Sequence, residues 1–264
     1  MNYLENGNVT SPAGFVTGAA ASGIKNGSAN GLDLAVLYSE RPCSAAGLFT
    51  RSQVVAAPVI VDRIILEKNP ANIHAVVANS GNANACTGPL GLSNTRQMQD
   101  NTAAVLGIEA GQVLVLSTGV IGVQLPMDRV NAGISAAAAD LSAESGPQAA
   151  EAIMTTDMVP KYAAVQVMLP GGVVTIGGMC KGSGMIHPDM ATMLAVHTTD
   201  ATIDYQTLQS LLRTAVDQSY NRISVDGDTS TNDTVLMLAN GAGGVPVADA
   251  ESLAVFQEAL NTLA

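Results

Sequence analysis

The sequence predicts an α/β protein built as a layered α+β sandwich, in which helices cover a sheet. Eight short apolar runs have the length and β-branched composition of strands, and they alternate with four longer stretches of helical periodicity. The composition supplies a core: 47% of the 264 residues are hydrophobic, and 12% are charged, about half the ~25% of typical soluble domains. A chain of this length and composition folds rather than staying disordered.

The expected strands are short runs rich in Val, Ile and Leu. Pro170, Gly171 and Gly172 stand between two of them and predict a tight turn, so these two runs should form a hairpin. The eight runs are 33–38, 54–61, 73–78, 112–117, 162–169, 172–177, 193–198 and 234–239.

The expected helices repeat their apolar residues every three to four positions. In the last one, Leu253, Phe256, Leu260 and Leu263 share one face, as they would when packed on a sheet. The four ranges are 91–106, 128–143, 205–219 and 250–263. No linker or repeat marks a domain boundary, and the weakest segment is 140–150.

The charge excludes several classes of function. A net charge of -11 repels phosphate backbones and anionic membranes. No stretch approaches the roughly 18 apolar residues of a membrane span, and the first residues lack the pattern of a signal peptide, so we expect a soluble cytoplasmic protein. Cys43, Cys86 and Cys180 lack metal-ligand spacing and are expected to be buried free thiols.

Four segments are polar without a helical or strand period: 79–88, 117–122, 181–192 and 226–234. Each touches an apolar strand, where binding groups concentrate in sheet proteins, although each could also be a simple turn that caps a helix. None matches a dinucleotide loop, a phosphate loop, a zinc or calcium motif, or the GxSxG elbow of hydrolases. The sequence therefore predicts no metal and no cofactor.

Two of these segments are chemically suggestive. Thr118 and Gly119 follow an apolar strand directly, so a hydroxyl and a backbone N–H could form an oxyanion hole there. Thr192 stands at the start of another strand, directly after Ala191. If the bond between them broke, the freed α-amine of Thr192, with a pKa of ~7.7 to 8.0, could act as base for its own hydroxyl. Ordinary β propensity also explains a threonine at this position.

The segment KGSGMIHPDMATMLAVHTTDA at 181–201 closely resembles the self-cleavage segment of the glutamate N-acetyltransferases, or ornithine acetyltransferases, known as the ArgJ family of arginine biosynthesis. Similar matches run almost from end to end of the chain. They cover 14–25, 45–59, 76–88, 116–128, 152–157 and 219–241.

The resemblance implies a DmpA/ArgJ-like fold and a self-processing enzyme with an N-terminal nucleophile. Cleavage between Ala191 and Thr192 would give an α chain, 1–191, and a β chain, 192–264, that stay associated. Thr192 would be the nucleophile, and Thr118 and Gly119 would form the oxyanion hole. Thr155, Lys181 and Thr192 match positions that contact the substrate in the family.

The resemblance also implies substrates and partners. The family moves an acetyl group from N-acetylornithine to glutamate through an acetyl-threonine ester, and some members accept acetyl-CoA as donor. Its usual assembly is an α2β2 heterotetramer. Because the substrates carry carboxylates, Lys181 is a sensible counter-charge in an acidic protein, whereas without the resemblance it would be read as a solvated loop cation.

One departure affects this prediction. Family members continue beyond the position of Ala264 into a segment that contributes to the substrate site, so the resemblance indicates a chain truncated at its C-terminus. Two other functions stay open: a self-processing aminopeptidase or amidase that uses water as acceptor, and a truncated relative without catalysis.

Overall fold

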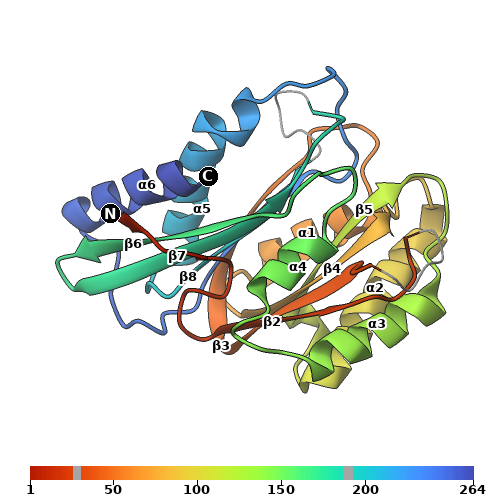
Figure 1. The fold of residues 1–264 in the computed structure, drawn as a ribbon, viewed down its shortest axis with the longest axis horizontal. Coiled ribbons are helices and arrows are strands. Elements are labelled where there is room, and N and C mark those ends of the chain that lie inside the picture. Colours follow the sequence, from red (N-terminus) through yellow and green to blue (C-terminus); the bar gives the residue numbers. More distant parts are fainter. Residues whose placement is uncertain (26–30, 187–192) are drawn as a thin grey trace.

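Nine strands, six α-helices and two short 3-10 turns make up the structure that the computed structural model describes, which comprises residues 1–25, 31–186 and 193–264 (Figure 1). The strands are β1 (Asn2–Tyr3), β2 (Phe15–Ala20), β3 (Leu34–Phe49), β4 (Ile73–Asn82), β5 (Val113–Val120), β6 (Lys161–Leu169), β7 (Gly172–Lys181), β8 (Leu194–Thr199) and β9 (Thr234–Ala239). The helices are α1 (Ala57–Lys68), α2 (Gly88–Leu106), α3 (Met127–Ala139), α4 (Gly146–Ala152), α5 (Tyr205–Gln218) and α6 (Ala250–Leu263), and the turns are η1 (Ala110–Gln112) and η2 (Tyr220–Arg222).

The strands hydrogen-bond in the order β1-β6-β7-β8-β9-β3-β4-β5, and β2 pairs with β3. The long strand β3 joins two half-sheets. Its first part pairs with β2 and β4, its last part pairs with β9, and the register shifts between Tyr38 and Cys43. We call β1, β6–β9 and the end of β3 the β6–β9 half-sheet, and β2, the start of β3, β4 and β5 the β2–β5 half-sheet.

The two half-sheets stack between two layers of helices. Helices α5 and α6 cover the outer face of the β6–β9 half-sheet, and α2 and α3 cover that of the β2–β5 half-sheet (Figure 1). Strand β5 is continuously apolar because both of its faces are buried. Val113 and Val115 face α2 and α3, while Leu114 and Leu116 face the core between the half-sheets. The predicted layered α/β sandwich is therefore confirmed.

Most predicted elements are present, including the β6–β7 hairpin, in which Leu169 pairs with Gly172. The strand expected at 54–61 is wrong, because this segment begins helix α1. Pro58 stands in the first turn of that helix, where its missing N–H costs nothing, and the helix buries Val59 and Val61. Packing against the neighbouring strands thus overrides the β propensity of its valines.

The weak segment at 140–150 is not a boundary between domains. Helix α4 begins there, and its buried Ala149, Ala150 and Ala152 close one side of the core between the half-sheets. The expectation of buried thiols is confirmed for Cys43 but is wrong for the other two cysteines, because Cys180 is half-buried and Cys86 is exposed. Cys86 lies in a loop at a φ of 57°, outside the strands that bury their side chains.

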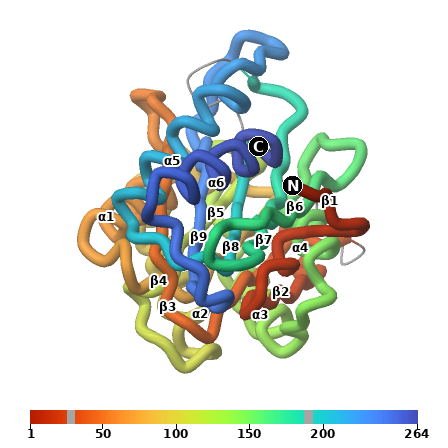
Figure 2. The backbone as a smooth tube through the Cα atoms, turned by 90° about the vertical axis from the view of Figure 1, so that its left-hand side faces the viewer, coloured from red at the N-terminus to blue at the C-terminus, as the bar shows by residue number. Residues whose placement is uncertain are grey.

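Both ends of the chain lie on the same side of the molecule, next to α6 and β6 (Figure 2). The hydroxyl of Tyr3 donates a hydrogen bond to the carbonyl of Thr262 at 3.1 Å. Among the helices of the described residues, none has the length and apolar character needed to cross a membrane.

Candidate active site

A cavity of about 540 Å³ lies where the two half-sheets meet. The carboxyl ends of the parallel strands β4 and β5 form one side, and the end of β7 and the segment before β9 form another. All four polar segments singled out from the sequence reach this cavity. Its lining residues are Lys25, Gly81, Ala83, Thr118, Gly119, Val120, Ile121, Thr155, Thr156, Lys181, Gly184, Met185, Ser230, Thr231 and Asn232.

Thr118 and Gly119 are near the end of β5 and line the cavity as the sequence predicts. They pair with Ser80 and Gly81 of β4. Gly119 has a φ of 132°, and a Cβ atom there would lie 2.3 Å from the carbonyl carbon of Gly81. Only glycine fits such an approach, so the backbone at this point is fixed closely against β4. Donation to an oxyanion stays a prediction.

Lys181 is the last residue of β7 and is only 1% exposed, which rules out a solvated loop cation. Burial lowers its pKa to about 8, although the negative charges of Asp157 and Asp233 act in the opposite direction. An ammonium in such surroundings gains more from an anionic ligand than an exposed one does. Lys181 is thus suited to hold a carboxylate in the cavity.

Thr155 lies in the loop between α4 and β6, and it lines the cavity together with Thr156. Its backbone N–H donates to the carboxylate of Asp157 at 3.3 Å. This loop is exposed to solvent and has no regular structure, and it bounds the cavity on this side.

Ala191 and Thr192, the predicted cleavage residues, lie outside the described residues. Met193 is the next described residue, and its backbone N–H donates to Oδ1 of Asp233 at 3.2 Å. Asp233 is 1% exposed, and burial raises its pKa to about 7 despite its hydrogen bonds and the nearby charge of Lys181. A titratable carboxyl group therefore holds the residue that follows Thr192.

Sequence reasoning marked 226–234 as polar but gave its residues no role. Asn232 connects the half-sheets here, because its side-chain amide donates to the carbonyls of Ala83 at 2.6 Å and Ser117 at 2.8 Å. Lys25 was missed as well; its ammonium donates to the carbonyl of Leu32, and burial lowers its pKa. The signal for Asn232 was an amide two residues before a fully buried strand.

Within the described residues, no group of three or more His, Cys, Asp or Glu side chains could hold a metal ion. The cavity instead offers hydroxyls, backbone groups and two lysines. This set is suited to bind a small molecule that carries a carboxylate.

Comparison with known proteins identifies the family of this chain. A model of the ArgJ family matches residues 16–264. The arginine biosynthesis bifunctional protein ArgJ of Symbiobacterium thermophilum is 57% identical over 246 residues, which cover 93% of this chain and 60% of that protein. The chain thus spans about six tenths of the length of such relatives.

Two solved structures are similar to this chain in fold. Ornithine acetyltransferase from Mycobacterium tuberculosis, crystallised with ornithine, is 38% identical with a TM-score of 0.65, covering 73% of this chain and 99% of that chain. The L-aminopeptidase D-Ala-esterase/amidase of Ochrobactrum anthropi, a variant of the Ntn hydrolase fold, has a TM-score of 0.58 over 100% of this chain and 87% of its own. At 12% identity, it is similar in fold alone.

The predicted DmpA/ArgJ-like fold is therefore confirmed. The family model spans all but the first residues, and the bacillary ArgJ of Bacillus halodurans, at 38% identity and a TM-score of 0.66, agrees in structure over 73% of this chain and 97% of its own. Since a relative is also 57% identical over 93% of this chain, the chain belongs to the ArgJ family.

Proposed function

We propose that the protein transfers an acetyl group from N-acetylornithine to glutamate after cleaving itself between Ala191 and Thr192. The Thr192 hydroxyl attacks the acetyl carbonyl of N-acetylornithine, the amide C–N bond breaks, and ornithine leaves with a proton. The amine of glutamate then attacks the acetyl ester, and the threonine oxygen recovers its proton. The freed α-amine of Thr192 acts as base.

The observation that carries this proposal is the convergence of Thr118, Gly119, Thr155 and Lys181 on one cavity from three separate segments: the end of β5, the loop before β6 and the end of β7. In a family member, these positions correspond to an oxyanion hole and to substrate contacts. One cavity of about 540 Å³ suits a two-step reaction whose donor and acceptor are similar amino acids, because each can occupy it in turn.

The comparison with the Mycobacterium tuberculosis enzyme supports cleavage. The aligned part, 73% of 264 or about 193 residues, accounts for 99% of the chain in that structure. That chain is therefore close in length to the fragment 1–191. The ornithine in the same crystal supports an amino-acid substrate of this kind.

Four further features belong to the same proposal. Acetyl-CoA serves as an additional acetyl donor, no other cofactor takes part, and the α and β chains assemble as an α2β2 heterotetramer. The protein acts in the cytoplasm.

Two measurements on the purified protein test the proposal. Intact mass spectrometry should give fragments 1–191 and 192–264, and a Thr192→Ala variant should remain uncut, while Thr192→Ser should still cleave because it keeps a hydroxyl. With N-acetylornithine labelled in its acetyl group, the label should appear on glutamate.

The alternatives give different results. Label released as free acetate, with none on glutamate, would identify a hydrolase that uses water as acceptor. Cleavage without any turnover would identify a non-catalytic relative, and an uncut wild-type chain would contradict the nucleophile assignment.

A further inference from the structure

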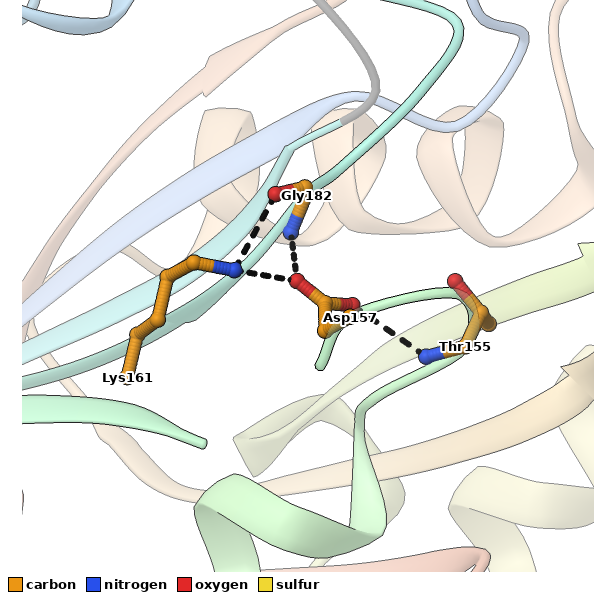
Figure 3. Close-up of polar contacts among 4 residues, drawn as sticks. All are labelled: Thr155, Asp157, Lys161 and Gly182. Carbon is orange, nitrogen blue, oxygen red and sulfur yellow. Dashed lines mark hydrogen bonds and ion pairs between the residues drawn. The ribbon is translucent and has the colours of Figure 1, made fainter. Parts of the chain in front are cut away.

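Asp157 joins two parts of the cavity wall that are separate in the sequence. One oxygen of its carboxylate, Oδ1, accepts the backbone N–H of Gly182 at 2.8 Å and also pairs with the ammonium of Lys161. The other, Oδ2, accepts the backbone N–H of Thr155 at 3.3 Å. Figure 3 shows these contacts meeting at the one carboxylate.

One of these two N–H groups belongs to Thr155, and the other belongs to Gly182, the residue after Lys181. Thr155 and Lys181 are both predicted substrate contacts. Thr155 itself lines the cavity from the loop between α4 and β6. The Gly182 N–H is in the peptide unit that begins with Lys181, the buried lysine at the end of β7. A single side chain therefore holds the loop carrying Thr155 against the strand end that carries Lys181.

No other hydrogen bond between described residues ties the segment 155–160 to β7. The segment has little else to hold it, because Thr155, Thr156 and Met158 are exposed and no regular structure is present. Lys161 reinforces the same junction, since its ammonium also donates to the Gly182 carbonyl at 3.1 Å.

The environment of Asp157 fits a fixed, ionised hydrogen-bond acceptor. Its side chain has no exposed surface, while that of Lys161 is 41% exposed. Burial alone would raise the pKa of Asp157, but the hydrogen bonds from Lys161, Gly182 and Thr155 together lower it. A charged acceptor forms stronger bonds to backbone N–H groups than a neutral one does.

We propose that Asp157 is a positioning residue, whose carboxylate sets the placement of Thr155 relative to Lys181 and so the shape of the cavity where the amino-acid substrate binds. It acts through these two residues and does not itself line the cavity. The consequence for turnover rests on the proposed acetyl transfer, whereas the consequence for the loop does not.

Hydrogen exchange measured by mass spectrometry tests the placement without any turnover. In Asp157→Ala, the amides of Thr155 and Gly182 should exchange at least about ten-fold faster than in the wild type, because both lose their acceptor. Asp157→Asn keeps one acceptor oxygen and should lie between the two. Asp204→Ala is the matched control: Asp204 also accepts two backbone N–H groups, from Gln206 and Thr207, but at the start of α5 and away from the cavity.

Steady-state kinetics on the same proteins test the effect on the substrate. We expect Asp157→Ala to raise KM for N-acetylornithine and glutamate about ten-fold or more, since Thr155 and Lys181 would no longer be held in place to bind the substrate. Asp157→Asn should recover part of that loss. Asp204→Ala should lower the melting temperature and leave KM unchanged, because a smaller folded fraction changes the apparent kcat alone.

Unchanged exchange at Thr155 and Gly182, or unchanged KM values in Asp157→Ala, would overturn the proposal. If the wild-type protein transfers no acetyl group, the proposed function fails, and the exchange measurement still decides whether Asp157 holds the loop.

Discussion

Glycine at position 119 allows β5 to approach β4 at the cavity more closely than any residue with a Cβ atom would. Both strands turn to a positive φ there, at Gly81 and Gly119, just where they reach the cavity. Thr118, the residue before Gly119, is only 4% exposed, so packed neighbours fix the environment of its hydroxyl. These restraints provide the preorganisation that an oxyanion hole needs, because donors fixed in advance need no reorganisation during the reaction.

Thr118→Val tests the role of that hydroxyl. Valine keeps the shape of threonine and removes the donor, so acetyl transfer should slow by about 10²- to 10³-fold with little change in melting temperature. Thr102→Val is a matched control, since Thr102 in α2 is a buried threonine whose hydroxyl has no hydrogen-bond partner among the described residues. Equal transfer rates in both variants would make 117–122 an ordinary strand-to-helix turn.

Among the residues of the cavity, the sequence could identify those that lie in recognisable motifs, such as Thr118 and Lys181. It could not identify Asp157 or Asp233. Asp157 is one aspartate in a short polar run and Asp233 is one of three in 226–234, and an exposed aspartate would look the same in the sequence. Their burial depends on contacts with segments 25 and 40 residues away, with Gly182 and Met193, which only the folded chain brings together.

Local sequence patterns predicted strands well where both faces of the strand are buried. They failed where tertiary contacts decide the type or the length of an element. Helix α1 reads as a strand because of its valines, yet it packs along β5, where its Asp62 accepts the backbone N–H of Val115 at 2.9 Å. The end of β3 was missed for a different reason. Its central residues Glu40, Arg41 and Pro42 are polar or lack an N–H, so the apolar run stops at the bend where β3 passes from one half-sheet to the other.

The burial of His197 makes the stability of the protein depend on pH. His197 of β8 is 2% exposed and contacts the hydroxyl of Tyr220 through Nε2, and burial lowers its pKa to about 4. The unfolded chain takes up a proton below its ordinary pKa of about 6.5, whereas the folded one does not. The stabilisation is thus present above pH 6.5 and is lost as the pH falls toward 4, by about 2 kcal/mol at pH 5.

Urea unfolding of His197→Gln at pH 7 and pH 5 measures this effect, best in the uncut Thr192→Ala background so that one chain unfolds. The difference in unfolding free energy between the two proteins should narrow by about 2 kcal/mol at the lower pH. A difference that stays constant would mean that His197 is protonated in the folded state at pH 5.

For the whole molecule, the predicted cut would fall between strands that are neighbours in the sheet. Strand β7 of fragment 1–191 pairs with β8 of fragment 192–264 over residues 176–181 and 194–199. Strand β9 of the second fragment pairs with β3 of the first. Separating the fragments would therefore break the centre of the sheet and expose the core on both of its faces.

We accordingly expect the cleaved protein to elute as one species in native gel filtration and to give two bands after denaturation. The Thr192→Ala protein should elute at the same volume and give one band. Release of fragment 192–264 under native conditions would contradict the pairing of β7 with β8 and of β3 with β9.

The position of β9 also bears on how the chain folds during its synthesis. This strand lies between β8 and the end of β3, the strand that joins the two half-sheets, yet the ribosome produces β9 after the other eight strands that the structure describes. Its partner residues in β3 precede it by 185 to 195 positions, as the pairs Phe49 with Thr234 and Ser44 with Ala239 show. Until residue 239 has emerged, the nascent chain has two unpaired strand edges facing a gap, which are sites where β-rich intermediates aggregate. Insertion of β9 is a contact of very long range, so the protein should fold slowly for its size.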